Sequence, residues 1–256
     1  MSEERPSFFE SGGSDLPAKE KEDNNSREAG FKVASPELLR HLAQDPIEEE
    51  NPFAKTPYTL TASQQRYLKF KRLFDVCFAC LGLALFLPFG LILALLIKLS
   101  SPGPVLFRQS RIGLHRKVFT IYKFRSMRMD APPAIATANF VDSKQYIPPI
   151  GSFLRRTSLD EVPQLLNVIK GDMSLIGYRP LIYNEREMDQ RREQLGVYQL
   201  RPGLSGYAQI NGRDKLGTKE KSCLDRQYLE RCSLACDWKI FWHTVRYVLT
   251  RKDVAF

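Results

Sequence analysis

Asp160 and Glu161 are adjacent carboxylates in a segment that is otherwise rich in arginine. Arg155 and Arg156 precede the pair, and Arg179 follows it. Cationic side chains keep a nearby carboxylate ionised and bind phosphate oxygens, so this combination predicts chemistry on a phosphorylated substrate. A simpler alternative is a solvated helix start, in which the two acidic side chains only complement the helix dipole.

The residues around this pair predict the start of a helix. Apolar side chains recur at helical spacing, at Leu159, Val162, Leu166 and Ile169. Ser158, with Glu161 three residues later, matches a capping box, whereas Pro163 opposes a regular second turn because it has no backbone N–H. A helix start would place the positive end of the helix dipole and its free N–H groups beside Asp160.

A long apolar run precedes this segment. Residues 76–97 are 22 positions without a charged side chain, which is enough to cross a bilayer. Pro88 interrupts the run, and basic residues flank it: Lys69, Lys71 and Arg72 before it, and Lys98, Arg108 and Arg111 after it. The positive-inside rule would keep both basic clusters cytoplasmic. Residues 66–99 are therefore predicted to form a re-entrant helix–break–helix, and a bitopic helix kinked at the proline is the alternative.

The charge of the chain is unevenly divided. The net charge is +9, yet residues 1–60 carry 13 acidic and 7 basic side chains. The other 196 residues carry 31 basic and 16 acidic side chains, which predicts an anionic partner such as a membrane surface, a nucleic acid or a phosphorylated substrate. Residues 1–60 are rich in Ser, Glu, Pro and Asn, and they are predicted to be a disordered extension without a cleavable signal peptide.

Short strand-like and glycine-rich segments follow the apolar run. Residues 105–109 and 118–124 are predicted to be strands, and in the second Lys123 alternates with aromatic side chains. Residues 201–213 contain three glycines and a proline, which suit close approach of the backbone to a nucleotide or phosphate beside Arg213. We expect a small, mostly helical α+β catalytic domain over residues 100–256.

The last part of the chain, residues 218–256, is predicted to be helical. One apolar stripe recurs at helical spacing, at Trp238, Phe241, Trp242, Val245, Val248 and Leu249. Two tryptophans beside basic residues suit a helix that lies in a membrane interface, and packing into a protein core explains the stripe equally well.

Several of these segments resemble, in the expected order, the bacterial sugar transferases. These are the monotopic phosphoglycosyl transferases that start glycan assembly on a polyprenyl phosphate. The resemblance covers residues 69–256, and its motifs are Gln109, Arg111 and Gly113, the YKFRSM run at 122–127, the segment 154–180 and the glycine-rich segment 201–213. The chain departs from the family pattern at Leu87, Tyr178 and Tyr207, where Ser, Pro and Trp are usual.

The resemblance implies a two-step transfer. Asp160 attacks the β-phosphate of a UDP-sugar, releases UMP and forms an aspartyl-phosphosugar, which polyprenyl (undecaprenyl) phosphate then attacks. Mg²⁺ beside Asp160 would neutralise the diphosphate, and Glu161 is a candidate base or orienting group. The substrate-binding residues implied are Lys123, Arg125, Arg155, Arg179, Arg213 and Asp237. The enzyme would be monotopic at the inner (cytoplasmic) membrane, with its catalytic domain facing the cytoplasm, and would catalyse the first membrane step of exopolysaccharide assembly.

Two other classes of function fit parts of the sequence. A nucleic-acid-binding protein is suggested only by the basic charge. No nucleic-acid motif accompanies that charge, and the apolar run also argues against this class. A non-catalytic scaffold at the membrane surface would have no use for paired carboxylates among arginines. We therefore expect a lipid bilayer, a UDP-sugar and a polyprenyl phosphate as partners, and no nucleic acid.

Overall fold

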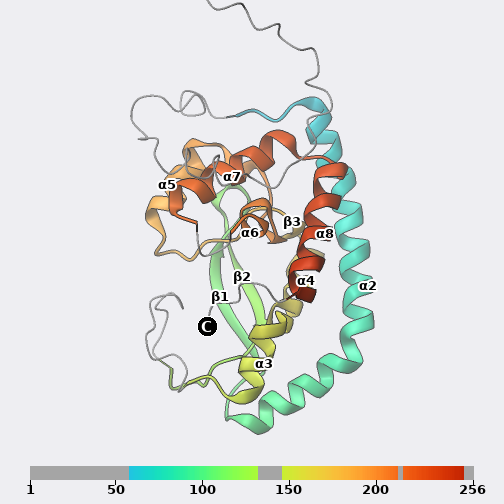
Figure 1. Ribbon diagram of the computed structural model, residues 1–256, viewed down its shortest axis with the longest axis vertical. Helices are drawn as coiled ribbons and strands as arrows, with labels where there is room; N and C mark the ends of the chain where they lie inside the picture. The colour runs from blue at the N-terminus through green and yellow to red at the C-terminus, as the bar shows by residue number, and fades with distance from the viewer. Residues whose placement is uncertain (1–57, 132–145, 213–215, 251–256) are drawn as a thin grey trace, which may run out of the picture. The chain divides into compact units, whose positions relative to one another are not determined.

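A computed structural model describes residues 58–131, 146–212 and 216–250 (Figure 1). The strands are β1 (Leu106–Ile112), β2 (Val118–Phe124), β3 (Ser174–Ile176) and β4 (Gly203–Ser205). The helical segments are α2 (Ala62–Ser100), η1 (Leu114–Arg116), α3 (Pro149–Thr157), η4 (Leu159–Gln164), α4 (Leu165–Lys170), α5 (Arg186–Gln194), η5 (Val197–Gln199), α6 (Tyr207–Ile210), α7 (Thr218–Arg231) and α8 (Leu234–Thr250). This mixture of helices with short strands agrees with the predicted α+β class. The predicted disordered extension falls outside the described residues except for its last three positions.

The apolar run forms most of α2, a single helix of 39 residues. A capping box begins it: the Thr61 hydroxyl accepts from the backbone N–H of Gln64, and the Gln64 side chain accepts from the backbone N–H of Thr61. Pro88 lies inside the helix, and Figure 1 shows that α2 bends in its later part. The predicted break is thus a bend in a continuous helix, because a proline removes one N–H without ending the helix on its own.

One face of α2 packs on the rest of the domain along the whole length of the helix. Its buried residues are Gln64, Lys71, Asp75, Ala79, Gly90, Leu93 and Ile97. Ala79 lies in a core cluster with Ile121 of β2 and Val168 of α4, whereas Leu93 lies in a second cluster. Phe124 and Leu154 belong to the second cluster, so β2 contributes to both. One face of α2 therefore packs against β2 at two separate places.

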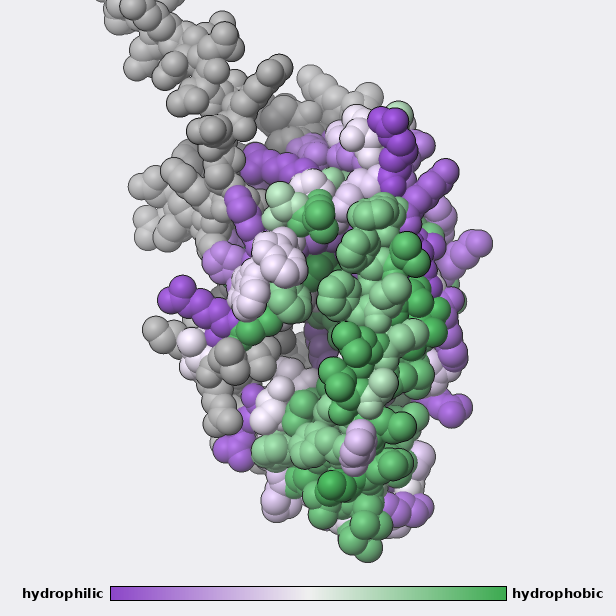
Figure 2. Space-filling model, turned by 90° about the vertical axis from the view of Figure 1, so that its right-hand side faces the viewer, coloured by the Kyte–Doolittle hydropathy of each residue, from purple (hydrophilic) through white to green (hydrophobic). Residues whose placement is uncertain are grey.

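The opposite face of α2 is exposed and apolar. Its exposed large side chains include Leu81, Leu85, Leu91, Ile92, Leu95 and Leu99. Figure 2 shows a broad hydrophobic area on this side of the molecule. By length and composition α2 is able to cross a membrane, and only 17% of its most apolar stretch is buried inside the protein. An exposed apolar surface of this extent marks a contact with a membrane or another apolar partner.

β1 and β2 form an antiparallel hairpin that holds the centre of the domain together. The predicted strand over residues 118–124 is confirmed, and the first strand extends to Ile112. On the outer edge of β2, the side chain of Asn167 takes the place of a third strand. Its amide nitrogen donates to the carbonyl of Thr120, and its amide oxygen accepts from the N–H of Tyr122. Because Asn167 belongs to α4, these bonds fix α4 against the hairpin.

The glycines of the segments around β3 and β4 allow two backbones to touch. β3 and β4 pair in parallel. A Cβ atom on Gly203 would clash with the backbone nitrogen of Gly177, and one on Gly206 would clash with the Gly177 carbonyl oxygen. For two of the three glycines in residues 201–213, this corrects the prediction that they accommodate a nucleotide or phosphate. At positions 203 and 206, they accommodate the chain itself.

The predicted C-terminal helix is two helices, α7 and α8, and the aromatic stripe of α8 faces outward. Trp238, Phe241 and Trp242 are 45–56% exposed, whereas Ile240 is fully buried. The three exposed rings contact one another at centroid distances of 5.5–5.8 Å. Core packing is therefore the wrong explanation for these aromatic residues, and a surface function remains. Figure 1 shows α8 beside α2, so both exposed apolar surfaces belong to neighbouring helices.

Candidate active site

The carboxylate pair lies on η4, a short 3-10 segment that follows α3. Ser158 joins the two with a left-handed backbone (φ 57°), and its N–H donates to the carbonyl of Arg155. The predicted capping box is therefore wrong: Ser158 is both the last cap of α3 and the first cap of η4, but its side chain makes no capping hydrogen bond. Pro163 lies inside η4, in agreement with the absence of a regular α-helical turn there.

Glu161 is held by cations from two other elements. Lys123 Nζ of β2 lies 2.7 Å from Glu161 Oε1, and Arg179, which follows β3, lies 3.6 Å from the same oxygen. The side chains of Lys123 and Glu161 are 16% and 17% exposed, so solvent screens their ion pair only in part. The contact joins η4 to β2, and it brings Lys123, Arg179 and Glu161 together as the sequence predicted.

Asp160 is half-buried next to this ion pair. The pKa of its carboxyl is raised to about 6, mainly by burial. The negative charge of Glu161 adds to the rise, whereas the positive charges of Lys123, Arg155 and Arg179 oppose it. Among the described residues, no hydrogen bond or ion pair occupies the carboxylate of Asp160. The side chain is therefore largely ionised at neutral pH and still available to a ligand, whereas Glu161 is already engaged.

Two further arginines border the carboxylates. Arg155 of α3 donates from Nε to the Ser126 hydroxyl over 3.1 Å. Its pKa is lowered by burial, and Asp160 opposes the change. Arg111 of β1 was not among the predicted substrate-binding residues, although it belongs to the family motif. Burial and the adjacent charge of Arg179 together lower its pKa to about 10, and Glu185 and Glu161 oppose the change. Two guanidinium groups held together in this way favour an anion beside them.

A cavity of about 190 Å³ lies next to the carboxylate segment, with Glu161 in its lining. Its apolar wall consists of Val162 and Leu165 from the carboxylate segment and Leu204 and Ile210 from the glycine-rich segment. α8 contributes Thr244 and Tyr247, and the other lining residues are Ser158, Glu161, Ser205 and Gln209. We name this space the η4–α8 cavity. Its position puts an apolar volume next to a charged site.

Comparison with known proteins identifies the family. Residues 66–251 match the family model described as "Bacterial sugar transferase". The chain belongs to the bacterial sugar transferase family.

Several relatives of this transferase have names that state a reaction or pathway. The undecaprenyl-phosphate glucose phosphotransferase of Komagataeibacter xylinus is 38% identical over 74% of this chain, which spans only 38% of that relative. The UDP-glucose:undecaprenyl-phosphate glucose-1-phosphate transferase of Caulobacter vibrioides is 44% identical, with 70% of each chain covered. The exopolysaccharide production protein PSS of Rhizobium leguminosarum bv. phaseoli is 40% identical over 72% of this chain and 97% of its own.

Arg125 does not reach the site of this transferase. Its side chain is 4% exposed and donates to the carbonyls of Ile97, Ser101 and Pro102. The N–H groups of the Arg125 guanidinium thus bind carbonyl groups at the C-terminal end of α2, where carbonyl groups lack partners within the helix. We assign Arg125 a structural role in place of the predicted substrate-binding role.

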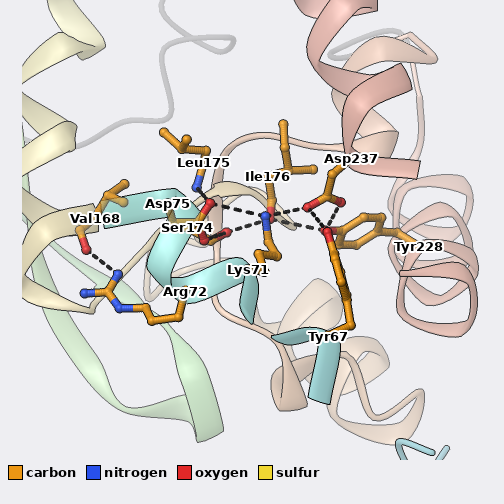
Figure 3. A network of polar contacts seen from close by, with 10 residues as sticks. All are labelled: Tyr67, Lys71, Arg72, Asp75, Val168, Ser174, Leu175, Ile176, Tyr228 and Asp237. Atoms are coloured by element: carbon orange, nitrogen blue, oxygen red, sulfur yellow. Dashed lines mark hydrogen bonds and ion pairs between the residues drawn. The ribbon is translucent and has the colours of Figure 1, made fainter. Parts of the chain in front are cut away.

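Asp237 is also occupied elsewhere, in a buried polar network that joins α2, α7 and α8 (Figure 3). Lys71 Nζ lies 2.5 Å from Asp237 Oδ2 and 3.3 Å from Asp75. The hydroxyls of Tyr67 and Tyr228 each donate to Asp237 over 2.7 Å. Both carboxylate oxygens therefore have partners inside the protein. The predicted substrate-binding role of Asp237 is replaced by a structural one.

Two predictions remain, a substrate-binding role for Arg213 and a metal ion beside Asp160. Arg213 lies outside the described residues. No group of three or more His, Cys, Asp or Glu side chains that could hold a metal ion occurs in the described ranges.

The structural role of Asp237 predicts that Asp237→Asn destabilises the fold. The amide leaves Lys71 without its nearest counter-charge in a buried setting, where removal of one partner costs about 3–5 kcal/mol. Thermal unfolding in detergent measures this loss. The control is Asp130→Asn, which removes the exposed ion pair with Arg128 and should cost less than about 1 kcal/mol. Equal melting temperatures for both variants would contradict the assignment.

Proposed function

We propose that this transferase moves a sugar 1-phosphate from a UDP-sugar to polyprenyl phosphate and releases UMP, as the first membrane step of exopolysaccharide assembly. The observation that carries the proposal is the half-buried, unoccupied carboxylate of Asp160 amid Lys123, Arg155 and Arg179. The names of the relatives support the same donor and acceptor. The relatives that bear such names differ in their sugar, so the proposal covers UDP-sugars as a class.

In the first step, Asp160 acts as the nucleophile. A carboxylate oxygen attacks the β-phosphorus, the bond between this phosphorus and the bridging oxygen breaks, and UMP leaves with the electron pair. The product is an aspartyl-phosphosugar. In the second step, an oxygen of polyprenyl phosphate attacks the same phosphorus, and the Asp160 carboxylate leaves. One site thereby handles a soluble donor and a lipid acceptor in turn.

Glu161 acts in this mechanism as an orienting residue. Its ion pair with Lys123 at 2.7 Å leaves it poorly suited to attack phosphorus. The same ion pair holds the ammonium group beside Asp160, and the contact with Arg179 holds a guanidinium there. Cations fixed in advance can stabilise the charge that develops on the phosphoryl oxygens without reorganising during the reaction. Arg111, next to Arg179, adds to this positive field.

The residues present fit a Mg²⁺ ion that is shared with the substrate. Mg²⁺ is commonly held by one or two carboxylates together with substrate phosphates, and Asp160 supplies one such carboxylate. When bound, the ion would offset the negative charge of the donor diphosphate. The adjacent cations, Lys123 and Arg155, offset the remainder.

We also propose a monotopic, cytoplasm-facing arrangement at the inner membrane, in which α2 enters and leaves on the same side. Near the start of α2, the Gln64 amide donates to the carbonyls of Leu229 and Glu230 in α7. At the other end, Arg125 of the hairpin donates to Ile97 and Ser101. A bitopic helix would separate its ends by a hydrocarbon core of about 30 Å, so both ends could not contact one domain. The exposed face of α2 and the tryptophans of α8 would then rest in one leaflet.

Replacing the nucleophile tests the reaction. Asp160→Asn keeps the shape of the side chain but removes the charge and the nucleophilic oxygen, so UMP release from a UDP-sugar should fall by more than about a thousandfold. The assay measures UMP across a panel of UDP-sugars, and Asp130→Asn is the matched control at an exposed ion pair. Near-native UMP release by Asp160→Asn would remove Asp160 from its proposed role.

Removal of divalent cations tests the metal. Transfer should stop in excess chelator and return when Mg²⁺ is added, because the donor diphosphate otherwise meets an ionised Asp160 with like charge. A chelator saturated with Mg²⁺ beforehand serves as the control for unrelated effects of the chelator. Undiminished turnover in the unsaturated chelator argues against the metal.

Accessibility of single cysteines tests the topology. Lys69→Cys and Pro102→Cys place exposed thiols near the two ends of α2, in a background that lacks the five native cysteines. An impermeant thiol reagent should label neither on intact cells and both after permeabilisation. Glu187→Cys, at an exposed position of α5, reports the side of the catalytic domain. Labelling of one end of α2 but not the other on intact cells would identify a bitopic helix.

A further inference from the structure

The η4–α8 cavity has no part in the chemistry described so far, yet it adjoins that chemistry. Glu161 forms part of its wall on one side. On the other side its wall is α8, the helix whose outer face carries Trp238, Phe241 and Trp242. The cavity thus lies between the charged site and a helix with an exposed aromatic surface.

The cavity also lies close to α2. Leu165 contributes to the cavity wall, and a Cβ atom on Gly82 of α2 would lie 3.4 Å from Leu165 Cδ1. A single side chain thus separates the cavity from the apolar helix. Figure 2 shows a hollow in the apolar side of the molecule, beside the hydrophobic area. An apolar molecule that rests against this side is therefore near the cavity.

Part of the polar lining of the cavity already has partners within the protein, but the buried amide oxygen of Gln209 has no hydrogen-bond partner in the described structure. The hydroxyls of Ser205 and Thr244 lie 2.6 Å apart, and the Thr244 hydroxyl also donates to the carbonyl of Ile240 over 2.8 Å. The Gln209 amide nitrogen donates to the carbonyl of Leu204. A sugar in this space would bring hydroxyl groups that need partners, whereas a hydrocarbon needs none. The apolar wall of Val162, Leu165, Leu204 and Ile210 therefore favours a hydrocarbon over a sugar.

We propose that the η4–α8 cavity holds the isoprene units next to the phosphate of the lipid acceptor. The proposal rests on the proposed function and adds a location for the lipid. A dry apolar cavity of about 150 Å³ accommodates a benzene-sized molecule, so about 190 Å³ suits one or two five-carbon units. With the chain in this cavity, its phosphate would lie on the Glu161 side, where Lys123 and Arg179 complement its charge.

Filling the cavity tests this location kinetically. Thr244→Phe and Ile210→Phe add bulk from two different elements, and each should raise the apparent KM for polyprenyl phosphate by about tenfold or more. The apparent KM for the UDP-sugar should change less than about twofold, because the inference places only the lipid in this cavity. His243→Phe places the same phenyl ring next to Thr244 at a position that does not line the cavity, and it should leave both constants unchanged. Thr244→Val separates loss of the hydroxyl from gain of volume.

A binding measurement that needs no turnover accompanies the kinetics. A short isoprenyl phosphate with a diazirine on its first isoprene unit is photolysed with the full-length protein in lipid nanodiscs, and the labelled peptides are identified by mass spectrometry. Labels should fall on residues 158–165, 204–210 and 244–247 and decrease in Ile210→Phe. Melting temperatures show whether each variant is folded.

The outcomes distinguish this inference from the proposed function. Labels confined to the outer face of α2, or a KM change for the UDP-sugar instead of the lipid, would overturn the cavity assignment while transfer still occurs. Labelling of the cavity in a protein that releases no UMP would retain the lipid site and reject the proposed reaction. Equal effects of His243→Phe and Thr244→Phe would also contradict the assignment.

Discussion

The site depends above all on the contact between β2 and η4, whose centre is the ion pair of Lys123 with Glu161. η4 is a 3-10 segment of six residues with a proline inside it, so it has little stability of its own. Its shape is imposed from outside, by the hairpin on one side and by α3 and α4 at its ends. Asp160 is positioned through this contact without taking part in it. A reactive carboxylate can thus stay unpaired because its neighbour supplies the structural bond.

α2 has two functions that place opposite demands on its faces. Its inner face carries charges, Lys71 and Asp75, deep within a polar network that ties it to α8. Such buried ion pairs add little net stability, yet they fix one arrangement of the helices because any other would leave a charge unpaired. Over residues 76–97, the outer face is apolar and carries no charged side chain. A helix of this kind can rest against a membrane and still hold the catalytic domain at a defined position.

Sequence reasoning located the carboxylates, the second strand and the apolar helix, since each depends on local patterns. It erred where the partners of a residue come from distant segments. Asp237 and Arg125 are residue types that often bind substrates. Only the fold reveals that Tyr67 and Tyr228 donate to Asp237, and that Arg125 donates to carbonyl groups at the end of α2. The Ser158 capping box failed because residues 149–157 are also helical, so the serine ends a helix. The glycines at 203 and 206 looked like phosphate-binding positions, but the backbone that they approach is Gly177.

The side chain of Asn167 also has a consequence for the shape of the sheet. An open strand edge invites pairing with a strand from another molecule, which is a common route to aggregation. Asn167 satisfies the edge groups of Thr120 and Tyr122 with one amide. A third strand would do the same, but it would also bring a row of side chains alongside β2. With the amide in its place, the sheet stays two strands wide, and the side of β2 that carries Lys123 remains open to η4.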